Sequence, residues 1–357
     1  MEPRDLSDHT EYVAGQGIEE VARELGRDPS ELVKLASNEN PFGPSPKAVD
    51  AIRESAPGVH HYPKSAHTDL TEAIAAKWAV DSSQIWLSPG GDGALDYLAR
   101  AMLEPGDTVL VPDPGFAYYE MSSRFHHGTV SRYSIGEATE FALTPETVLD
   151  SYQGERIVYL TSPHNPLGGQ FTIEAVREIA AATDDETLVI VDEAYGEFAE
   201  GESARTLLDQ RTDIAVLRTF SKAYGLAGLR LGYTIVPSPW ADAYARVNTP
   251  FGVSSIACMA GQAALEDDEH VERTVETVKW AREYMRSEIE APVHESHGNF
   301  VMVEVGDGTA VADAMRDRGV IIRDLSSFGL PAHVRITAGT NSETKQAVRE
   351  LNEVLES

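Results

Sequence analysis

Short apolar runs rich in valine, isoleucine and leucine alternate with helix-like patterns through the middle of the chain. Each run has the length of a buried strand, and the segments between them place apolar residues at helical spacing. The runs are Thr108–Pro112, Ile157–Thr161, Leu188–Asp192, Ala215–Thr219 and Thr234–Val236. This alternation predicts an α/β fold in which helices flank a mostly parallel sheet.

The pattern changes near both ends of the chain. Apolar residues recur at helical spacing from Ile18 to Leu25, and Gly26 then ends this short predicted helix. From about residue 255 a long helical region runs to Glu290. Apolar runs at 300–304, 320–323 and 334–337 follow, which is typical of a smaller α+β domain that ends in a helix. We expect an N-terminal arm (1–42) that joins the small domain, a large domain (43–254), and a helical connection with the small domain (255–357).

The chain is strongly acidic, which excludes some classes of partner. Its 357 residues include 58 acidic and 29 basic ones, for a formal net charge of −29. Nucleic acids and anionic membrane surfaces would be repelled, so neither is expected as a partner. Only seven of the basic residues are lysines. Acidity with so little lysine indicates a high-salt cytoplasm, where salt screens the self-repulsion.

Targeting and metal signals are weak. No apolar stretch approaches the ~18 residues of a membrane span, so we expect a soluble, cytoplasmic protein. Cys258 is the single cysteine, which rules out a disulfide within the chain. No metal site is predicted, because the adjacent pairs His60–His61 and His126–His127 would point to opposite faces of an extended chain.

The most informative segment surrounds Lys222. It reads Thr219-Phe-Ser-Lys222 and is followed, eight residues after the lysine, by Arg230 within a glycine-rich stretch. Such a segment offers an amine that bonds to aldehydes beside hydroxyl and guanidinium groups that hold a phosphate. Lys222 is also the only lysine between Lys77 and Lys279. The combination suits pyridoxal phosphate.

Three predicted strands end in polar residues. Asn165 comes shortly after the run at 157–161, Asp192 ends the run at 188–192, and Lys222 follows the run at 215–219. Ligands of parallel α/β sheets lie beyond the carboxyl ends of the strands, so we expect these three side chains to converge on one crevice.

The ordered set of these residues resembles fold-type I, class I/II aminotransferases, and within them the histidinol-phosphate aminotransferase family. The resemblance rests on Asn165, Asp192, Tyr195, Lys222, Arg230 and the stiff segment Asn38–Pro46, and it runs from about Tyr12 to the last helix. It implies a large pyridoxal-phosphate-binding domain with a mostly parallel sheet, a smaller α+β domain, and a homodimer.

The resemblance also implies roles for the catalytic residues. Lys222 would bond covalently to the cofactor aldehyde and later carry protons as base and acid. Asp192 would pair with the protonated pyridine nitrogen of the cofactor. Tyr195 and Asn165 would donate hydrogen bonds to the oxygen on the cofactor ring.

The cofactor phosphate is expected at the turn Ser88–Gly93, whose backbone amides would meet the positive end of a following helix. Gly91, Asp92 and Gly93 supply this cradle, and Ser221 and Arg230 complete it. Members of the family commonly have an acidic residue at the position of Gly93, so a side-chain role there is in doubt.

Two aromatic positions complete the expected cofactor site. Phe116 is the first candidate to stack on the cofactor ring, with Tyr118 and Tyr119 as rivals. Tyr62 matches the family position that reaches the cofactor phosphate of the neighbouring subunit.

Substrate anions are expected in the small domain. By resemblance, Arg335 holds the α-carboxylate of glutamate in one half-reaction, and with Arg323 it holds the phosphate of histidinol phosphate in the other. Asn299 and Asn40 are further candidates for the substrate pocket.

Other activities remain as alternatives. The G-x-G-x-x-G and G-x-x-x-x-G-K-[ST] phosphate loops are absent, which argues against nicotinamide dehydrogenases and P-loop enzymes. A threonine-phosphate decarboxylase or an aromatic amino-acid aminotransferase would keep Lys222, Asp192 and Arg230. A non-enzymatic domain that senses pyridoxal phosphate is a remote alternative. We favour transfer of an amino group between L-histidinol phosphate and 2-oxoglutarate, in histidine biosynthesis.

Overall fold

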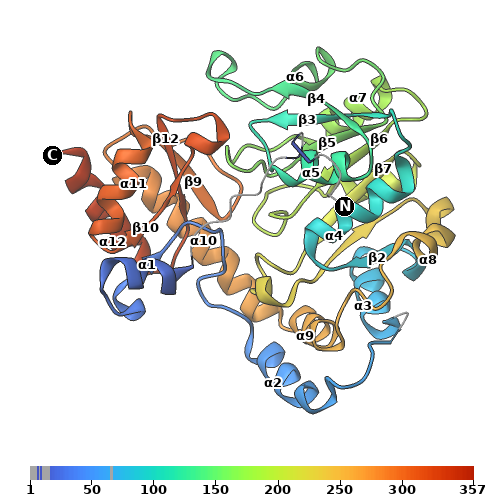
Figure 1. The fold of residues 1–357 in the computed structure, drawn as a ribbon, viewed down its shortest axis with the longest axis horizontal. Coiled ribbons are helices and arrows are strands. Elements are labelled where there is room, and N and C mark those ends of the chain that lie inside the picture. Colours follow the sequence, from blue (N-terminus) through green and yellow to red (C-terminus); the bar gives the residue numbers. More distant parts are fainter. Residues whose placement is uncertain (1–5, 8, 10–16, 65–66) are drawn as a thin grey trace.

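The computed structural model describes residues 6–7, 9, 17–64 and 67–357, and Figure 1 shows its two sheet-containing regions. The first part of the expected N-terminal arm, including Tyr12, therefore lies outside the described residues. One region is built on a seven-stranded sheet with the strand order β2-β8-β7-β6-β5-β3-β4. Its strands are β2 (Ile85–Ser88), β3 (Thr108–Asp113), β4 (Thr129–Ser134), β5 (Ile157–Thr161), β6 (Leu188–Asp192), β7 (Ile214–Thr219) and β8 (Gly232–Ile235).

The sheet is mostly parallel, as the sequence predicts. Strands β4, β3, β5, β6 and β7 run parallel to one another, whereas β8 is antiparallel to both β7 and β2. All five apolar runs form strands at the expected places. β2 and β4 were not predicted. β4 is a polar edge strand in which Tyr133 alone is fully buried, so it lacks an apolar run.

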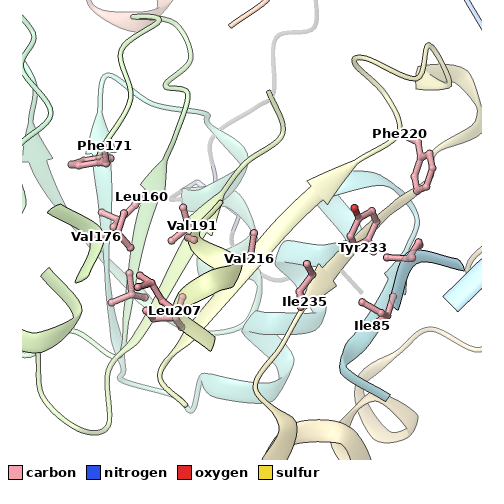
Figure 2. Packing of buried hydrophobic residues seen from close by; sticks show 14 of the residues in the cluster. Ile85, Leu160, Phe171, Val176, Val191, Leu207, Val216, Phe220, Tyr233 and Ile235 are labelled. Atoms are coloured by element: carbon pink, nitrogen blue, oxygen red, sulfur yellow. The ribbon is translucent and has the colours of Figure 1, made fainter. Parts of the chain in front are cut away.

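Apolar side chains cover both faces of the sheet, which explains the uninterrupted apolar runs of its central strands. Figure 2 shows Leu160, Val191, Val216 and Ile235 in one layer across neighbouring strands. The alternate residues of the same strands, such as Tyr159 and Ile190, pack on the other face.

Helices supply the partners of these two layers. α4 (Gly90–Met102), α5 (Tyr118–Phe125) and α8 (Tyr244–Val247) pack on the face of Tyr159 and Ile190. The opposite face is covered by α3 (Thr68–Trp78), α6 (Pro145–Leu149), α7 (Ile173–Ala182) and α9 (Ser255–Leu265), and α2 (Pro46–Ser55) packs against α9.

The second region lies at the left of Figure 1 and has its own core. Its antiparallel sheet has the strand order β11-β12-β9, from Arg323–Asp324, His333–Thr337 and Phe300–Glu304. It packs with α10 (Asp268–Glu288), α11 (Gly308–Asp317) and α12 (Asn341–Leu355). The expected long helical region is therefore two helices, because the chain leaves helical geometry at Glu266 and Asp267.

The described part of the N-terminal arm contacts the small region. α1 (Ile18–Leu25) ends at Gly26 in a left-handed conformation, as its sequence predicts. β1 (Val33–Lys34) then pairs in parallel with β10 (Val320–Ile321). The domain boundaries at 42/43 and 254/255 stay a prediction, and α9, just after the second one, packs into the core of the large region. Among the described residues, no helix combines the length and apolarity needed to cross a bilayer.

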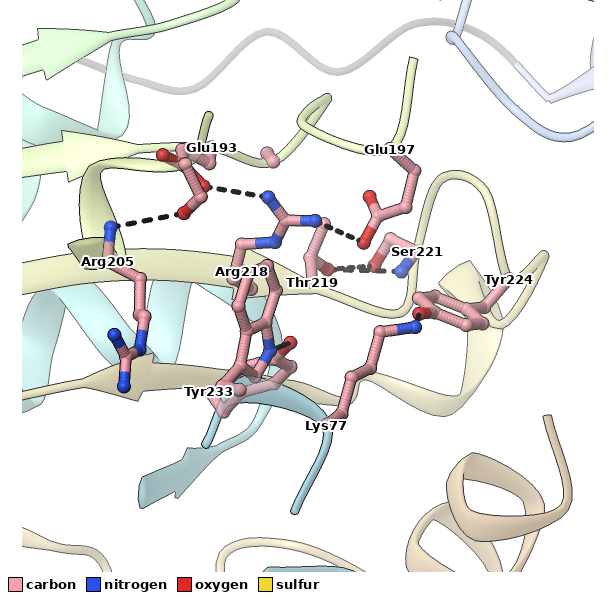
Figure 3. Close-up of polar contacts among 12 residues, drawn as sticks. Lys77, Glu193, Glu197, Arg205, Arg218, Thr219, Ser221, Tyr224 and Tyr233 are labelled. Atoms are coloured by element: carbon pink, nitrogen blue, oxygen red, sulfur yellow. Dashed lines mark hydrogen bonds and ion pairs between the residues drawn. The ribbon is translucent and has the colours of Figure 1, made fainter. Parts of the chain in front are cut away.

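A buried ion-pair cluster lies where β6 and β7 end, and Figure 3 shows it. Arg218 Nη1 donates to Glu193 Oε2 at 2.8 Å, and Arg218 Nη2 donates to Glu197 Oε1 at 2.6 Å. The Arg218 guanidinium also lies 4.8 Å from the centroid of the Trp78 ring. Although burial lowers the pKa of Arg218, the carboxylates of Glu197 and Glu193 raise it overall. The cluster ties the ends of two strands together just before Thr219 and Lys222.

We expect Arg218→Ala to lower the free energy of unfolding by about 3–5 kcal/mol, because it leaves two carboxylates buried without their counter-charge. Chemical denaturation in molar KCl measures the change. Arg53→Ala is the matched control, since its ion pair with Asp50 is exposed and should contribute less than about 1 kcal/mol. Equal effects of the two substitutions would contradict the importance of the buried cluster.

Candidate active site

The carboxyl ends of β5, β6 and β7 open into a cavity of about 700 Å³ between the two regions. Most of the residues predicted for the site line it. They are Gly91, Asp92, Phe116, Asn165, Asp192, Tyr195, Ser221, Lys222, Arg230, Arg323 and Arg335. Gly93, Tyr62, Asn40 and Asn299 are not among the lining residues.

Lys222 lies at the boundary between the regions. Its ammonium group lies 3.4 Å from the carbonyl oxygen of Ser37, to which it donates. The same nitrogen is 5.4 Å from the centroid of the Tyr195 ring. Lys222 is the only lysine among the described residues that line the cavity.

Asp192 ends β6 and is buried. Its Oδ1 accepts from the backbone N–H of Ala194 at 2.9 Å, and its Oδ2 accepts from the hydroxyl of Tyr119 at 2.6 Å. Burial raises the pKa of this carboxyl to about 6 despite both hydrogen bonds, and the negative charges of Asp92 and Glu193 add to the shift. A cation beside Asp192 would reverse the shift by favouring the carboxylate.

Tyr195 and Asn165 are both held by hydrogen bonds that come from other parts of the chain. The hydroxyl of Tyr195 accepts from Asn38 Nδ2 at 3.0 Å, and Asn38 Oδ1 accepts from Thr337. Asn165 Oδ1 accepts from Arg335 Nη1. The Asn165 side chain is thus fixed next to the arginine that is expected to hold the substrate carboxylate.

The turn expected to bind the cofactor phosphate forms the start of α4. The helix begins at Gly90, so the N–H groups of Gly90 to Gly93 lie in its first turn and have no partners within the helix. Arg230 Nη2 donates to Asp92 Oδ2 at 2.8 Å, and Arg230 Nη1 lies 3.4 Å from Ser221 Oγ. A Cβ atom at Gly90 would lie 2.4 Å from Arg230 Nη2, so glycine is what lets the guanidinium approach the helix.

Gly93 packs closely against Pro89. A Cβ atom there would lie 2.5 Å from Cδ of Pro89, so an acidic side chain at this position requires a shift of the turn. The structure therefore gives a packing reason for the departure from the family pattern. A role for its backbone N–H toward phosphate stays a prediction.

The aromatic candidates have different surroundings. Phe116 lines the cavity, and its ring meets the Tyr119 ring edge-on, with the centroids 5.6 Å apart. The hydroxyl of Tyr118 donates to Asp96, and the hydroxyl of Tyr119 donates to Asp192. Stacking of Phe116 on a cofactor ring stays a prediction.

Two arginines of the small region reach the cavity. Arg335, on β12, donates to the carbonyl oxygen of Ala36 and lies with its guanidinium 5.3 Å from the Phe300 ring centroid. Arg323, on β11, pairs with Arg335 across the antiparallel strands, and its guanidinium lies 5.8 Å from the ring centroid of Phe328. The two guanidinium groups thus come from neighbouring strands.

The remaining candidates lie outside the cavity. Asn40 donates to the carbonyl oxygen of Ala223 at 2.8 Å, and Asn299 donates to that of Asn38 at 3.0 Å. Both amides are buried and brace the segment 38–40 against the rest of the protein. Their direct contact with substrate stays a prediction.

Tyr62 lies on the surface. Its side chain is 83% exposed and stacks on Phe251, with the ring centroids 4.9 Å apart. It does not reach the cavity of its own chain, which leaves the expected contact with a neighbouring subunit untested.

Some lining residues were not predicted from the sequence. Thr161, Glu120 and Arg132 line the cavity, and Arg132 donates to both carboxylate oxygens of Glu120 at 2.7 Å. Thr161 ends β5, so the strand-end argument that found Asp192 also applies to it. No comparable sequence signal points to Glu120 or Arg132.

Comparison with known proteins agrees with this geometry. Residues 30–351 match the family described as Aminotransferase class I and II. The chain belongs to this family. It is 65% identical over 356 residues to a histidinol-phosphate aminotransferase of Haloarcula marismortui, with 100% of this chain and 99% of that protein covered. It is 64% identical to the enzyme of the same name from Halorubrum lacusprofundi, with 99% and 98% covered. These haloarchaeal relatives agree with the high-salt habitat that the composition indicates.

A solved structure shows the same fold with a cofactor. The histidinol-phosphate aminotransferase of Sinorhizobium meliloti, in complex with pyridoxal-5′-phosphate, has a TM-score of 0.84 and 28% identity, with 96% of this chain and 95% of that one covered. The predicted α/β architecture with a smaller second region is therefore confirmed. The residues of this aminotransferase fit such a group, because its cavity joins one lysine, one buried acid and an arginine at a glycine-lined helix start.

We expect Asp192→Asn to stabilise the cofactor-free protein at pH 8 by roughly 3 kcal/mol, since two pKa units correspond to that amount. In the folded protein the pKa of Asp192 is raised from 3.8 to about 6. The contribution of the Asp192 carboxyl to folding stability is therefore full below about pH 4 and is lost as the pH rises through 6. Unfolding in urea at pH 4 to 8 measures the difference between the two proteins. A pH-independent difference would contradict the raised pKa.

Proposed function

We propose that this aminotransferase converts L-histidinol phosphate and 2-oxoglutarate to imidazole acetol phosphate and L-glutamate, with pyridoxal phosphate as cofactor. The observation that carries the proposal is the single cavity shared by Lys222, Asp192, Arg230 and Arg335 in a chain so similar to enzymes of that name. The reaction belongs to histidine biosynthesis, and we place it in the cytoplasm.

The residues of the cavity divide between the two ends of the cofactor. Arg230, Ser221 and the first turn of α4 would bind its phosphate, because a guanidinium and free helical N–H groups both favour anions. Asp192 would bind its ring nitrogen, and Tyr195 and Asn165 its ring oxygen. When bound, the cofactor supplies an aldehyde that bonds to amines and a ring that withdraws electrons.

Lys222 is the base that we assign to the reaction. Its amine would take the proton from the substrate Cα and return one to the cofactor carbon, because the cavity offers no second lysine among its described lining residues. The ring of Tyr195 and the carbonyl oxygen of Ser37 hold the ammonium group in place before substrate binds.

Arginines determine which substrates fit. A glutamate α-carboxylate needs one fork of parallel N–H donors, which Arg335 offers next to Asn165. A phosphate carries about two charges at neutral pH and needs more donors. Arg323, which lines the same cavity from the neighbouring strand, would supply them.

The experiment presents the cofactor-loaded protein with glutamate, L-histidinol phosphate, L-threonine phosphate and aromatic amino acids in turn. We expect glutamate formation from L-histidinol phosphate and 2-oxoglutarate without release of carbon dioxide. Arg323→Gln should raise KM for histidinol phosphate about tenfold or more and leave KM for glutamate nearly unchanged, since it removes a charge-assisted contact to phosphate only.

Two outcomes would contradict the reaction. Carbon dioxide release from threonine phosphate would favour the decarboxylase, and preference for unphosphorylated aromatic substrates would favour the aromatic aminotransferase. Lys222→Arg should abolish turnover with every substrate, whereas Lys279→Arg, at an exposed ion pair, is the matched control and should retain it.

We further propose that the active unit is a homodimer. Large apolar side chains are exposed at Val59, Tyr62, Phe251 and Met259, with exposed fractions of 65%, 83%, 51% and 48%. They belong to the α2–α3 connection and to α9 with the segment before it, and α2 packs on α9. Exposed apolar side chains gathered on one part of a soluble protein favour a protein interface.

A mixing experiment tests whether Tyr62 serves the partner's site. Tyr62→Ala and Lys222→Ala should each be nearly inactive alone. If the two variants exchange subunits, half of the mixed dimers' sites combine an intact Lys222 with the partner's intact tyrosine, so activity should recover toward a quarter of the native value. Recovery is expected after mixing in partial denaturant and refolding. No recovery, with exchange verified by size-tagged subunits, would contradict the shared site.

A further inference from the structure

The buried carboxylate of Asp192 has a protein partner that comes from a distant part of the sequence. Its Oδ2 accepts from the hydroxyl of Tyr119, 73 residues earlier in the chain, at 2.6 Å. Hydrogen bonds in which the acceptor is ionised have this length. The hydroxyl of Tyr119 also lies 2.8 Å from Oγ1 of Thr161.

Counting protons fixes the direction of these contacts. A tyrosine hydroxyl has one hydrogen, and here it is donated to Asp192. The contact with Thr161 can therefore form only if the threonine hydroxyl donates to the oxygen of Tyr119. Thr161 and Asp192 are also opposite each other in the pairing of β5 with β6. The result is a directed chain from Thr161 through Tyr119 to the carboxylate.

The position of Tyr119 is well constrained. Its side chain is buried, and its ring stacks on Tyr159 with the centroids 4.8 Å apart. The helix α5 that carries it follows a tight turn at Gly115, where a Cβ atom would lie 2.4 Å from the carbonyl oxygen of Pro112. Packing therefore holds the hydroxyl in place whether or not Asp192 is charged.

The surroundings of Asp192 oppose its ionisation. It is buried, and the nearby Asp92 on α4 and Glu193, directly after β6, are negative, although Arg230 and Arg218 pair with them. The N–H of Ala194 and the hydroxyl of Tyr119 are the hydrogen-bond donors that the described residues offer to the carboxylate. Removing either one should leave the neutral acid favoured at a higher pH.

We propose that Thr161 and Tyr119 form a hydrogen-bond chain that keeps Asp192 ionised and oriented toward the ring nitrogen of the cofactor. Tyr119 is then a positioning residue, rather than one of the aromatic groups that stack on the ring. The inference rests on the proposed function only in naming that nitrogen as the partner of Asp192.

The test follows the ionisation of Asp192 in the cofactor-free protein. The stability difference caused by Asp192→Asn is measured from pH 4 to 9, once in the native background and once with Tyr119→Phe. The midpoint of its pH dependence should move upward by about one unit or more, which corresponds to the loss of one hydrogen bond to a charged group. The dissociation constant of pyridoxal phosphate at pH 7.5 should rise about tenfold.

Two further variants separate this role from ordinary packing. Tyr133→Phe removes another buried hydroxyl, which donates to the carbonyl oxygen of Tyr159, and should leave both the midpoint and the dissociation constant unchanged. Thr161→Val should shift the midpoint and the dissociation constant in the same direction as Tyr119→Phe, but by less. If Tyr119→Phe does not fold, the proposal is tested with Thr161→Val instead.

An unchanged midpoint in Tyr119→Phe, or in Thr161→Val where the former does not fold, would overturn the proposal. The midpoint needs neither cofactor nor substrate. A protein that shows the shift but transfers no amino group would therefore contradict the proposed function and leave the hydrogen-bond chain intact.

Discussion

The burial of charge at the carboxyl ends of the central strands constrains everything around the cavity. Asp192, Glu193 and Arg218 are all buried, and a buried ion without a partner costs several kcal/mol. Each of these charges has a partner. Arg218 forms ion pairs with two carboxylates, one of them that of Glu193, and Asp192 accepts two hydrogen bonds. The apolar strands determine where these residues lie, and the partners come from α5, from β7 and from the segment after β6.

This constraint also places Lys222. The ion pairs of Arg218 fix the end of β7. Thr219 is the next residue, and its hydroxyl accepts from the backbone N–H of Ser221 at 3.1 Å. The chain then turns so that Lys222 reaches Ser37, in the segment that joins the small region. The turn that carries Ser221 and Lys222, to which we assign phosphate binding and covalent chemistry, thus follows directly after a strand end that is fixed by buried ion pairs.

The sequence could predict the elements whose signals are local. Central strands buried on both faces appear as apolar runs, and their polar ends identified Asn165, Asp192 and Lys222. The edge strand β4 was not predicted because Thr129–Ser134 is mostly polar. The start of α4 at Gly90 was not predicted because glycines weaken a helix prediction. The hydrogen bond of Tyr119 with Asp192 has no local sequence signal, since it joins residues 73 positions apart that only the fold brings together.

The contrast between surface and cavity bears on how the protein selects anions. The net charge of −29 repels anionic substrates, yet Arg132, Arg230, Arg323 and Arg335 all line the cavity. At about 1 M salt the Debye length is only about 3 Å, so neither the repulsion of the surface nor the attraction of the cavity extends far into solution. Discrimination would then occur at contact, where each arginine offers a fixed fork of N–H donors that fits either anion, and a phosphate, with its greater charge, needs more of these donors than a carboxylate. Under the proposed function, specificity for anions would therefore depend on the number and directions of the arginine N–H groups in the cavity rather than on the net charge of the protein.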